Sequence, residues 1–519
     1  MPLSDRPVAP SGASRDRRHR LVALLAVAVV LLAGCVSPKN QAAGPTPGAT
    51  SPSPEATGDL ARYYGQQLEW TTCAEGECAT AQVPLDYADP AGASIGLALA
   101  RSKATGGEPL GSLLLNPGGP GASGVSFLDQ AKSMVGEDVQ RQYDLVAFDP
   151  RGVQRSNPVQ CVDGPALDQL IATDPDYSTD AGIQAVIDAY GELGAACLQN
   201  TGPALGHVDT VSAAKDMDVL RAALGEAKLD YLGASYGTKL GATYAELFPH
   251  QVGRFVLDGA LDVTLTVHQL AVGQARGFQT ALDAYVDNCV QTSNSCFLGG
   301  TREEGLAKIK DLLASLDQNP LSVGDRRLTE GNAFYGVALP LYNRDYWVLL
   351  SQALKAAFGG DGSALLRLSD AYASRNPDGS YADNSLEAFY AISCLDNPSY
   401  LTPAQAERQT ALFQKVSPTL GDAFDWSQVG CVGQVAKSHE KPLTIDGAGA
   451  APIVVVGTTR DPATPYAWAK ALASQLDSGV LVSRDGDGHT GYHSGNPCVD
   501  RAVESYLVDG KVPQDGLSC

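Results

Sequence analysis

One short stretch restricts the fold of this chain more than any other: KLDYLGASYGTKLGATYAELFP, residues 228–249. It begins with a short apolar run typical of a β-strand, and its apolar residues take helical spacing after Gly237. Between the two patterns lies Ser235, with Gly233 and Gly237 two residues away on either side. The glycines indicate a turn so tight that side chains at their positions would collide with neighbouring backbone. The stretch therefore predicts a strand, a tight turn that presents a serine, and a helix.

The same alternation of strand and helix recurs along much of the chain. Several apolar runs end in turn residues, as buried parallel strands do: GSLLLNPGG, YDLVAFDPRG, GRFVLDG, APIVVVGTTRDP and GVLVSRDGDGH. Helical periodicity is present in residues 125–135 and 210–224. The pattern predicts an α/β fold, with a mostly parallel central sheet that has helices on both faces.

A mostly helical segment interrupts this pattern between residues 263 and 445. It contains TREEGLAKIKDLLASL, which opens with a capping box formed by Thr301 and Glu304. After this segment the strand and helix pattern resumes. We therefore expect a core in two parts, residues 60–262 and 446–519, with a large helical cap inserted between them, and a chain of 519 residues is long enough for both.

The N-terminus has the features of a lipoprotein signal peptide. Arginines precede the apolar residues 21–32, which are too few to span a membrane comfortably, and the sequence LAGC ends at Cys35. This predicts removal of residues 1–34 and lipid attachment to Cys35; the alternative is an ordinary signal peptide followed by an incidental cysteine. Residues 35–59 are rich in Pro, Ser and Thr and predict a flexible tether. The protein would then be exported and lipid-anchored to the outer face of a bacterial cell membrane, in the cell envelope.

The remaining cysteines indicate disulfides. Of the 11 cysteines, the ten after Cys35 are even in number, as is common in exported chains. Sequential pairing is the simplest arrangement, although the sequence alone leaves the connectivity open. It would join Cys73–Cys78, Cys161–Cys197, Cys289–Cys296, Cys394–Cys431 and Cys498–Cys519. A zinc site is the alternative, but there is no C-x-x-C motif and the histidines do not cluster beside cysteines, so we expect no metal.

Ser235 has the sequence context of a catalytic nucleophile. The pattern G-x-S-x-G at the end of a strand holds the serine hydroxyl above the sheet. The helix that starts there directs its N–H groups and the positive end of its dipole at the same place, which favours an oxyanion. The alternative is a structural Gly-Ser turn, which the strand before and the amphipathic helix after disfavour.

A nucleophilic serine needs a base and an orienting carboxylate. His489 follows an apolar strand and a Gly-Asp-Gly turn, where a loop can place the imidazole over the sheet edge; His493 is the alternative. Asp461 directly follows the preceding strand, whereas Asp485 and Asp487 are nearer in sequence but would have to turn back sharply. The resulting order of serine, aspartate and histidine along the chain is that of α/β-hydrolases.

The first strand–helix loop and the amide after the serine would supply an oxyanion hole. The segment LLLNPGGPGASG fits this loop, and we expect the N–H groups of Gly119 and Tyr236 to be the donors, with Gly118 as the alternative. A phosphate-binding loop is the competing interpretation. However, no Lys-Ser/Thr pair follows, and the prolines remove amides that a phosphate would need. We therefore expect no nucleotide and no other cofactor.

The motifs NPGGPG, FDPRG, GASYG and RDPATP, taken in this order, resemble those of a known family. From about Leu60 to the C-terminus, the chain resembles the secreted tripeptidyl and prolyl aminopeptidases of actinobacteria, within the prolyl iminopeptidase-like α/β-hydrolase serine peptidases. It is more similar still to the mycobacterial cell-envelope serine protease and carboxylesterase lipoproteins of that group. The resemblance implies an α/β-hydrolase fold and the triad Ser235, Asp461 and His489. Asn116, where the better-known version of the motif has histidine, favours the tripeptidyl branch.

The resemblance also implies a function: a lipid-anchored serine exopeptidase that releases short N-terminal peptides through an acyl-enzyme. Family members hold the substrate amine with acidic side chains near the cap, and AISCLDNP resembles a segment typical of the group. Asp396 is therefore the candidate amine ligand, with Glu387 behind it. One alternative is a carboxylesterase acting on esters, since the same triad serves both reactions. Another is a catalytically inactive lipoprotein that binds peptides.

The charge of the chain restricts its partners. The net charge of −21, from 37 basic and 58 acidic residues, argues against nucleic acid and anionic membrane surfaces as direct partners. We expect a peptide or protein substrate with a free N-terminus, and contact with the membrane only through the lipid on Cys35.

Overall fold

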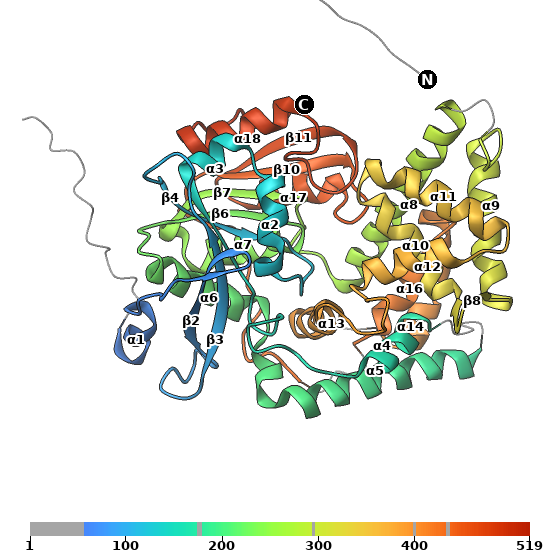
Figure 1. Ribbon diagram of the computed structural model, residues 1–519, viewed down its shortest axis with the longest axis horizontal. Helices are drawn as coiled ribbons and strands as arrows, with labels where there is room; N and C mark the ends of the chain where they lie inside the picture. The colour runs from blue at the N-terminus through green and yellow to red at the C-terminus, as the bar shows by residue number, and fades with distance from the viewer. Residues whose placement is uncertain (1–56, 174–178, 293–295, 398–400, 432–435) are drawn as a thin grey trace, which may run out of the picture. The chain divides into compact units, whose positions relative to one another are not determined.

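The computed structural model describes residues 57–173, 179–292, 296–397, 401–431 and 436–519 (Figure 1). The predicted signal peptide, the predicted lipid attachment at Cys35 and nearly all of the predicted tether lie outside these residues. Within the described ranges, no helix combines the length and the apolar character needed to cross a membrane.

A sheet of ten strands forms the core of the fold. In spatial order the strands are β1 (Thr71–Cys73), β2 (Gly76–Pro84), β3 (Ser94–Ser102), β5 (Tyr143–Phe148), β4 (Gly111–Asn116), β6 (Leu229–Ala234), β7 (Val252–Asp258), β10 (Ile453–Arg460), β11 (Gly479–Asp487) and β12 (Leu517–Ser518). The pairings from β1 to β5 are antiparallel. All later pairings in the sheet are parallel, which confirms the predicted α/β fold.

Helices cover both faces of this sheet. Successive side chains of a strand point to opposite faces, so Leu113 and Leu115 of β4 pack on one face and Leu114 on the other. The first face is covered by α2 (Gly124–Met134), α3 (Glu137–Gln142) and α18 (Pro497–Asp509), which lie together in Figure 1. The second is covered by α6 (Thr210–Ala223), α7 (Tyr236–Leu247) and α17 (Tyr466–Gln475). All three leucines are buried, and each such side chain contributes roughly 1.5–3 kcal/mol to stability.

A mostly helical segment separates β7 from β10 and has its own hydrophobic cluster. Its helices are α8 (Val267–Thr292), α9 (Arg302–Gln318), α10 (Glu330–Leu341), η4 (Arg344–Tyr346), α11 (Trp347–Phe358), α12 (Ser363–Tyr372), α13 (Ser385–Asp396), α14 (Pro403–Glu407), α15 (Thr410–Val416), α16 (Gly421–Trp426) and η5 (Ser427–Val429), with a hairpin of β8 (Leu321–Val323) and β9 (Arg326–Leu328). The hydroxyl of Thr301 caps α9 by accepting the N–H of Glu304 at 3.2 Å. The carboxylate of Glu304 accepts the N–H of Gly300 at 2.7 Å, so the reciprocal bond of the predicted capping box shifts by one residue.

Two helices that the sequence pattern did not predict precede Ser235 and pack against the cap. They are α4 (Gly164–Ile171) and α5 (Asp180–Thr201); the remaining short helices are η1 (Gly58–Leu60), α1 (Ala61–Tyr64), η2 (Gly202–His207) and η3 (Pro249–Gln251). Tyr190 of α5 stacks on Tyr390 of α13, with ring centroids 6.0 Å apart. Arg375 of the cap pairs with Asp168 of α4 at 2.5 Å.

Five disulfides join the ten predicted cysteines in sequential order. The pairs are Cys73–Cys78, Cys161–Cys197, Cys289–Cys296, Cys394–Cys431 and Cys498–Cys519. The sequential pairing expected as the simplest arrangement is therefore the one that forms.

Candidate active site

Ser235 lies on the tight turn between β6 and α7. Its φ of 56° and ψ of −123° are unfavourable for a residue with a Cβ atom. A Cβ at Gly233 would lie 2.6 Å from the carbonyl oxygen of Gly237, and one at Gly237 would lie 2.9 Å from Oδ1 of Asn116. Both positions are therefore restricted to glycine. The turn has the geometry predicted from the sequence, and α7 starts at the next residue, so its first N–H groups lie beside the serine.

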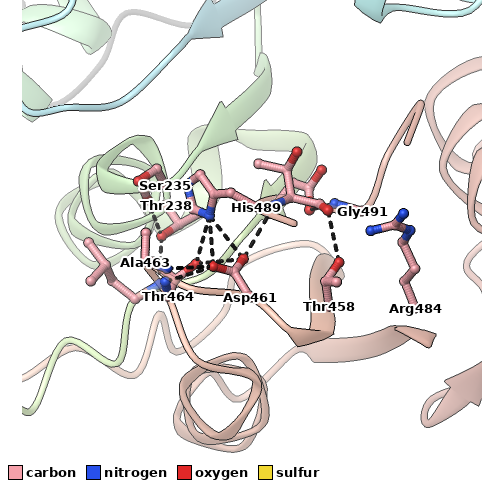
Figure 2. Close-up of polar contacts among 12 residues, drawn as sticks. Ser235, Thr238, Thr458, Asp461, Ala463, Thr464, Arg484, His489 and Gly491 are labelled. Carbon is pink, nitrogen blue, oxygen red and sulfur yellow. Dashed lines mark hydrogen bonds and ion pairs between the residues drawn. The ribbon is translucent and has the colours of Figure 1, made fainter. Parts of the chain in front are cut away.

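Asp461 directly follows β10 and is 2% exposed. Its carboxylate accepts the N–H groups of Ala463 and Thr464, both at 2.9 Å. The hydroxyl of Thr464 donates to it at 3.0 Å. Nδ1 of His489 lies 2.9 Å from each of the two carboxylate oxygens (Figure 2). Hydrogen bonds from the turn that follows Asp461 thus hold its carboxylate, and both carboxylate oxygens face the imidazole.

His489 has one ring nitrogen engaged and the other free to react. Burial lowers the pKa of His489, but the charge and hydrogen bond of Asp461, together with the charge of Asp258, raise this pKa above its ordinary value. The bond at Nδ1 favours the tautomer with its proton on that nitrogen. Nε2 is buried and has no hydrogen-bond partner in the part of the chain that the structure describes. Figure 2 shows the ring between Asp461 and Ser235, so Nε2 is the nitrogen that can accept a proton from the serine.

The cap holds the loop that carries His489. The N–H of His489 donates to the carbonyl oxygen of Tyr342 at 2.8 Å, and the two rings meet edge-on with centroids 5.4 Å apart. Arg344 on the same cap segment pairs with Asp487 at 2.9 Å. Gly488 has a φ of +101°, and a Cβ there would lie 2.9 Å from the Tyr342 oxygen. The position of the imidazole therefore depends on the cap as well as on the sheet.

The loop after β4 folds over the serine. Gly118 has a φ of +95°, and a Cβ there would lie 2.9 Å from Cβ of Ser235. The N–H of Gly118 donates to Oδ1 of Asn116 at 2.9 Å, so Gly118 is unsuited to be the alternative oxyanion donor. The N–H groups of Gly119 and Tyr236 have no hydrogen-bond partner among the residues described. These two amides remain the candidate donors.

The FDPRG motif supports this loop from outside the site. Asp149 is fully buried and accepts the hydroxyl of Ser123 at 2.6 Å and the N–H of Val125 at 3.1 Å, at the start of α2. Arg151, which is 1% exposed, pairs with Asp216 of α6 at 2.6 Å. The motif therefore fixes α2 and α6 against the sheet.

The structure argues against the two predicted amine ligands. Oδ2 of Asp396 pairs with Lys239 at 2.7 Å and accepts the Thr210 hydroxyl at 2.5 Å, and Oδ1 accepts the Thr210 N–H at 2.9 Å. A substrate ammonium at Oδ2 would compete with Lys239 and Thr210. Oε1 of Glu387 accepts the N–H of Cys161 at 2.6 Å, and burial raises the pKa of Glu387. Both carboxylates therefore join α13 of the cap to the core.

The alternative base and acids have partners other than the proposed triad. Asp485 and Asp487 pair with Arg460 at 2.8 and 2.5 Å. His493 has a φ of 55°, and its N–H donates to Asp500 at 2.8 Å. Of the residues predicted from the sequence, the structure thus brings Asp461 and His489 into direct contact. It places Ser235 on the other side of the imidazole, and among the described residues no hydrogen bond joins Ser235 to Nε2 of His489.

Two residues beside the site were not predicted. Asp258 ends β7 and accepts the N–H groups of Gly491 and Tyr492 at 2.8 and 2.9 Å, in the loop that carries the histidine. A signal for Asp258 was present: like Asp461, it follows an apolar run at the carboxyl end of a parallel strand, where the sites of open α/β sheets form. Tyr342 had no such signal, because its place depends on how the cap packs.

Comparisons with known proteins point to one group. Residues 417–519 match the family model described as TAP-like protein. The serine protease Hip1 of Mycobacterium tuberculosis is 34% identical over 541 residues, covering 97% of this chain and 99% of that protein. Carboxylesterase B of the same species is 37% identical over 507 residues, with 95% of each chain covered. The tripeptidyl aminopeptidase of Streptomyces lividans is 32% identical over 476 residues, with 88% of each covered. The solved proline iminopeptidase of Mycobacterium smegmatis has 13% identity and a TM-score of 0.36, covering 84% of this chain and 97% of that one.

Proposed function

This chain belongs to the α/β-hydrolase family that contains the serine protease Hip1, carboxylesterase B and the tripeptidyl aminopeptidases, and we propose that it hydrolyses peptides through Ser235, His489 and Asp461. One observation carries the proposal. Nδ1 of His489 lies 2.9 Å from both oxygens of the buried Asp461, beside a serine that a strained turn holds at the end of the sheet.

The proposed reaction proceeds through an acyl-enzyme. Oγ of Ser235 attacks the scissile carbonyl carbon while Nε2 of His489 takes the hydroxyl proton. Asp461 keeps the second proton on Nδ1 and stabilises the imidazolium that forms. The N–H groups of Gly119 and Tyr236 donate to the oxyanion of the tetrahedral intermediate. His489 then protonates the leaving amine, and it deprotonates the water that hydrolyses the acyl-enzyme.

The proposed substrate is a peptide or protein with a free N-terminus, from which short peptides are released. Similarity to a tripeptidyl aminopeptidase and to a serine protease over most of the chain supports this class. The amine would be held by cap groups other than Asp396 and Glu387, since those two carboxylates are engaged. Matched peptides with free and acetylated N-termini test the proposal. Only the free peptides should be cleaved, and equal cleavage of both would contradict exopeptidase activity.

A carboxylesterase is the second candidate function, because carboxylesterase B is 37% identical over 95% of this chain. The triad alone does not separate the two activities, since both proceed by acyl transfer. The kcat/KM values for a short-chain p-nitrophenyl ester and for a library of N-terminally free peptides separate them. An ester value far above that of every peptide would favour the esterase.

The Ser235→Ala variant tests the chemistry that both candidates share. Loss of the hydroxyl should lower kcat on the order of 10⁶-fold and abolish labelling by a fluorophosphonate. The matched control is Ser133→Ala, which changes an exposed serine on α2 and should retain both. Near-normal turnover by Ser235→Ala would end the proposal.

We further propose that the protein is exported and held at the outer face of a bacterial cell membrane by lipid on Cys35. The arginines and apolar run before Cys35 and the five disulfides, which persist in oxidising compartments, support this proposal. Metabolic labelling with a palmitate analogue should mark the wild-type protein and not the Cys35→Ser variant. Label retained by the variant would contradict lipid attachment at this residue.

A further inference from the structure

Asp258 is a buried carboxylate that the mechanism above does not use. It is the last residue of β7 and is 4% exposed. In the sheet, β7 lies between β6, which ends at Ala234 beside the proposed nucleophile, and β10, after which Asp461 follows. Asp258 therefore occupies the strand end between two members of the triad.

The backbone at Asp258 contacts the nucleophile and the base. The N–H of Ser235 donates to the carbonyl oxygen of Asp258 at 2.9 Å. The next residue, Gly259, has a φ of +64°, and a Cβ there would lie 3.0 Å from Cε1 of His489. This segment of backbone thus supports Ser235 on one side and approaches the imidazole on the other.

The side chain of Asp258 holds the loop that carries the base. Oδ1 accepts the N–H of Gly491 at 2.8 Å, and Oδ2 accepts the N–H of Tyr492 at 2.9 Å. Hydrogen bonds from backbone amides to a carboxylate are short and roughly twice as strong as neutral ones. The two amides lie two and three residues after His489, so the carboxylate fixes the chain immediately beyond the imidazole.

We propose that Asp258 is a positioning residue that holds the nucleophile and the base at a fixed separation. Its carbonyl oxygen fixes Ser235, and its carboxylate fixes the loop of His489, so one residue determines the relative placement of both. This inference rests on the proposed roles of Ser235 and His489.

The charge of Asp258 gives a readout that a purely structural role would not change. Burial raises the pKa of Asp258 to about 6. The hydrogen bonds from the N–H groups of Tyr492 and Gly491 and the charge of His489 lower this pKa, but burial has the larger effect. The charged groups that face it are His489, Asp461 and Arg484. The ionised Asp258 in turn raises the pKa of His489. Removing this charge should therefore move the acid limb of the rate profile to lower pH.

The test compares Asp258→Asn with Asp230→Asn. Asp230 on β6 is a matched control: burial raises its pKa, and it accepts the N–H of Arg254 at 2.6 Å and the hydroxyl of Tyr143 at 2.9 Å, away from the triad. For both variants, kcat, KM, the rate of fluorophosphonate labelling, the pH profile and the melting temperature are measured. Asp258→Asn should lose about 10²-fold in kcat and in labelling rate, with the acid limb moved to lower pH, because small displacements of catalytic groups have effects of this size. Asp230→Asn should keep wild-type rates and profile whatever its melting temperature.

Rates and a pH profile for Asp258→Asn that match those of Asp230→Asn would overturn the proposal. If Asp258→Asn does not fold, Asp258→Glu decides, because it keeps the charge but moves the carboxylate relative to the N–H groups of Gly491 and Tyr492 that it now holds. A clear fall in its labelling rate then supports the proposal, and a wild-type rate overturns it. The Ser235→Ala variant separates failure of the Asp258 proposal from failure of the proposed function. If Ser235→Ala still reacts with the fluorophosphonate, Ser235 is not the nucleophile.

Discussion

The φ of 56° at Ser235 is unfavourable by about 1–3 kcal/mol for a residue with a Cβ atom. Contacts with neighbouring elements keep it there. The N–H of Ser235 donates to Asp258 on β7, and the hydroxyl of Thr238 donates to the Ser235 carbonyl oxygen at 2.6 Å. The same hydroxyl of Thr238 accepts the N–H of Leu261 at 2.9 Å. The strained conformation is thus stabilised by the strand ends around it, and it leaves the hydroxyl of the serine directed at the site.

At the residue scale, the charge on Asp461 should determine the pH dependence of the reaction. His489 must be neutral to take the serine proton, so kcat/KM should fall as the pH drops through the pKa of His489. That pKa lies above its ordinary value, because the Asp461 charge and hydrogen bond outweigh the opposing effect of burial. In Asp461→Asn this pKa should fall, so the acid limb should move to lower pH while kcat falls about 10⁴-fold. A pH–rate profile of the variant measures both effects.

Asp485→Asn is the control for this experiment. Asp485 is 72% exposed and pairs with Arg460, so its replacement should leave kcat and the acid limb unchanged. An acid limb at the wild-type position in Asp461→Asn would show that another group orients the imidazole. An equal shift of the acid limb in Asp485→Asn would also contradict the proposed role of Asp461.

At the scale of elements, the connection between α10 and η4 brings the cap to the imidazole. The ring of Tyr342 packs edge-on against His489 and also against Phe278 of α8, with centroids 5.7 Å apart in the second pair. Tyr342→Ala should therefore lower the free energy of unfolding by about 2–4 kcal/mol and loosen the base, lowering kcat about tenfold. Chemical denaturation and steady-state kinetics measure the two effects.

The matched variant is Tyr342→Phe, which keeps the ring. The bond to the His489 N–H comes from the backbone oxygen of residue 342, so the phenylalanine variant should keep kcat. Wild-type kcat in Tyr342→Ala would show that the cap does not influence the base. Equal losses in both variants would assign the effect to the hydroxyl instead of the ring.

The elements that could be predicted from the sequence are those with local signals. The glycines around Ser235 and the apolar runs that end in turns identify the strands and the elbow, because tight turns and buried strands impose composition on their own residues. The surroundings of Asp396 had no local signal. Lys239 and Thr210 reach it from α7 and α6, and such pairings between distant elements appear only once the cap packs on the core. Without knowledge of these pairings, a carboxylate of the cap such as Asp396 is easily mistaken for a substrate ligand.

At the scale of the described chain, α13 links the cap to the sheet. Its residues Ala388, Ala391 and Ile392 pack in the hydrophobic cluster of the sheet, although most cap helices form a separate cluster. A Cβ at Gly121 of the loop after β4 would lie 2.5 Å from the carbonyl oxygen of Ser385, where α13 begins. The placement of α13 therefore affects the loop that carries Gly119, one of the two candidate oxyanion donors.

The disulfide Cys394–Cys431 fastens α13 at its other end, across a sequence separation of 37 residues. Replacing both cysteines with serine should lower the free energy of unfolding by about 4 kcal/mol, because the bond restricts a long loop of the unfolded chain. The control is the double serine variant of Cys73–Cys78, where the separation is 5 residues and the loss should be about 2 kcal/mol. Urea denaturation without reductant compares the free energies of unfolding of the two variants.

The activities of the two variants should also differ. The helix α13 packs on the loop after β4 that carries Gly119, whereas the β1–β2 hairpin is not part of that loop. Only the Cys394–Cys431 variant should therefore also lose activity below its unfolding transition. Equal activity in the two variants would mean that the core holds α13 without its covalent bond.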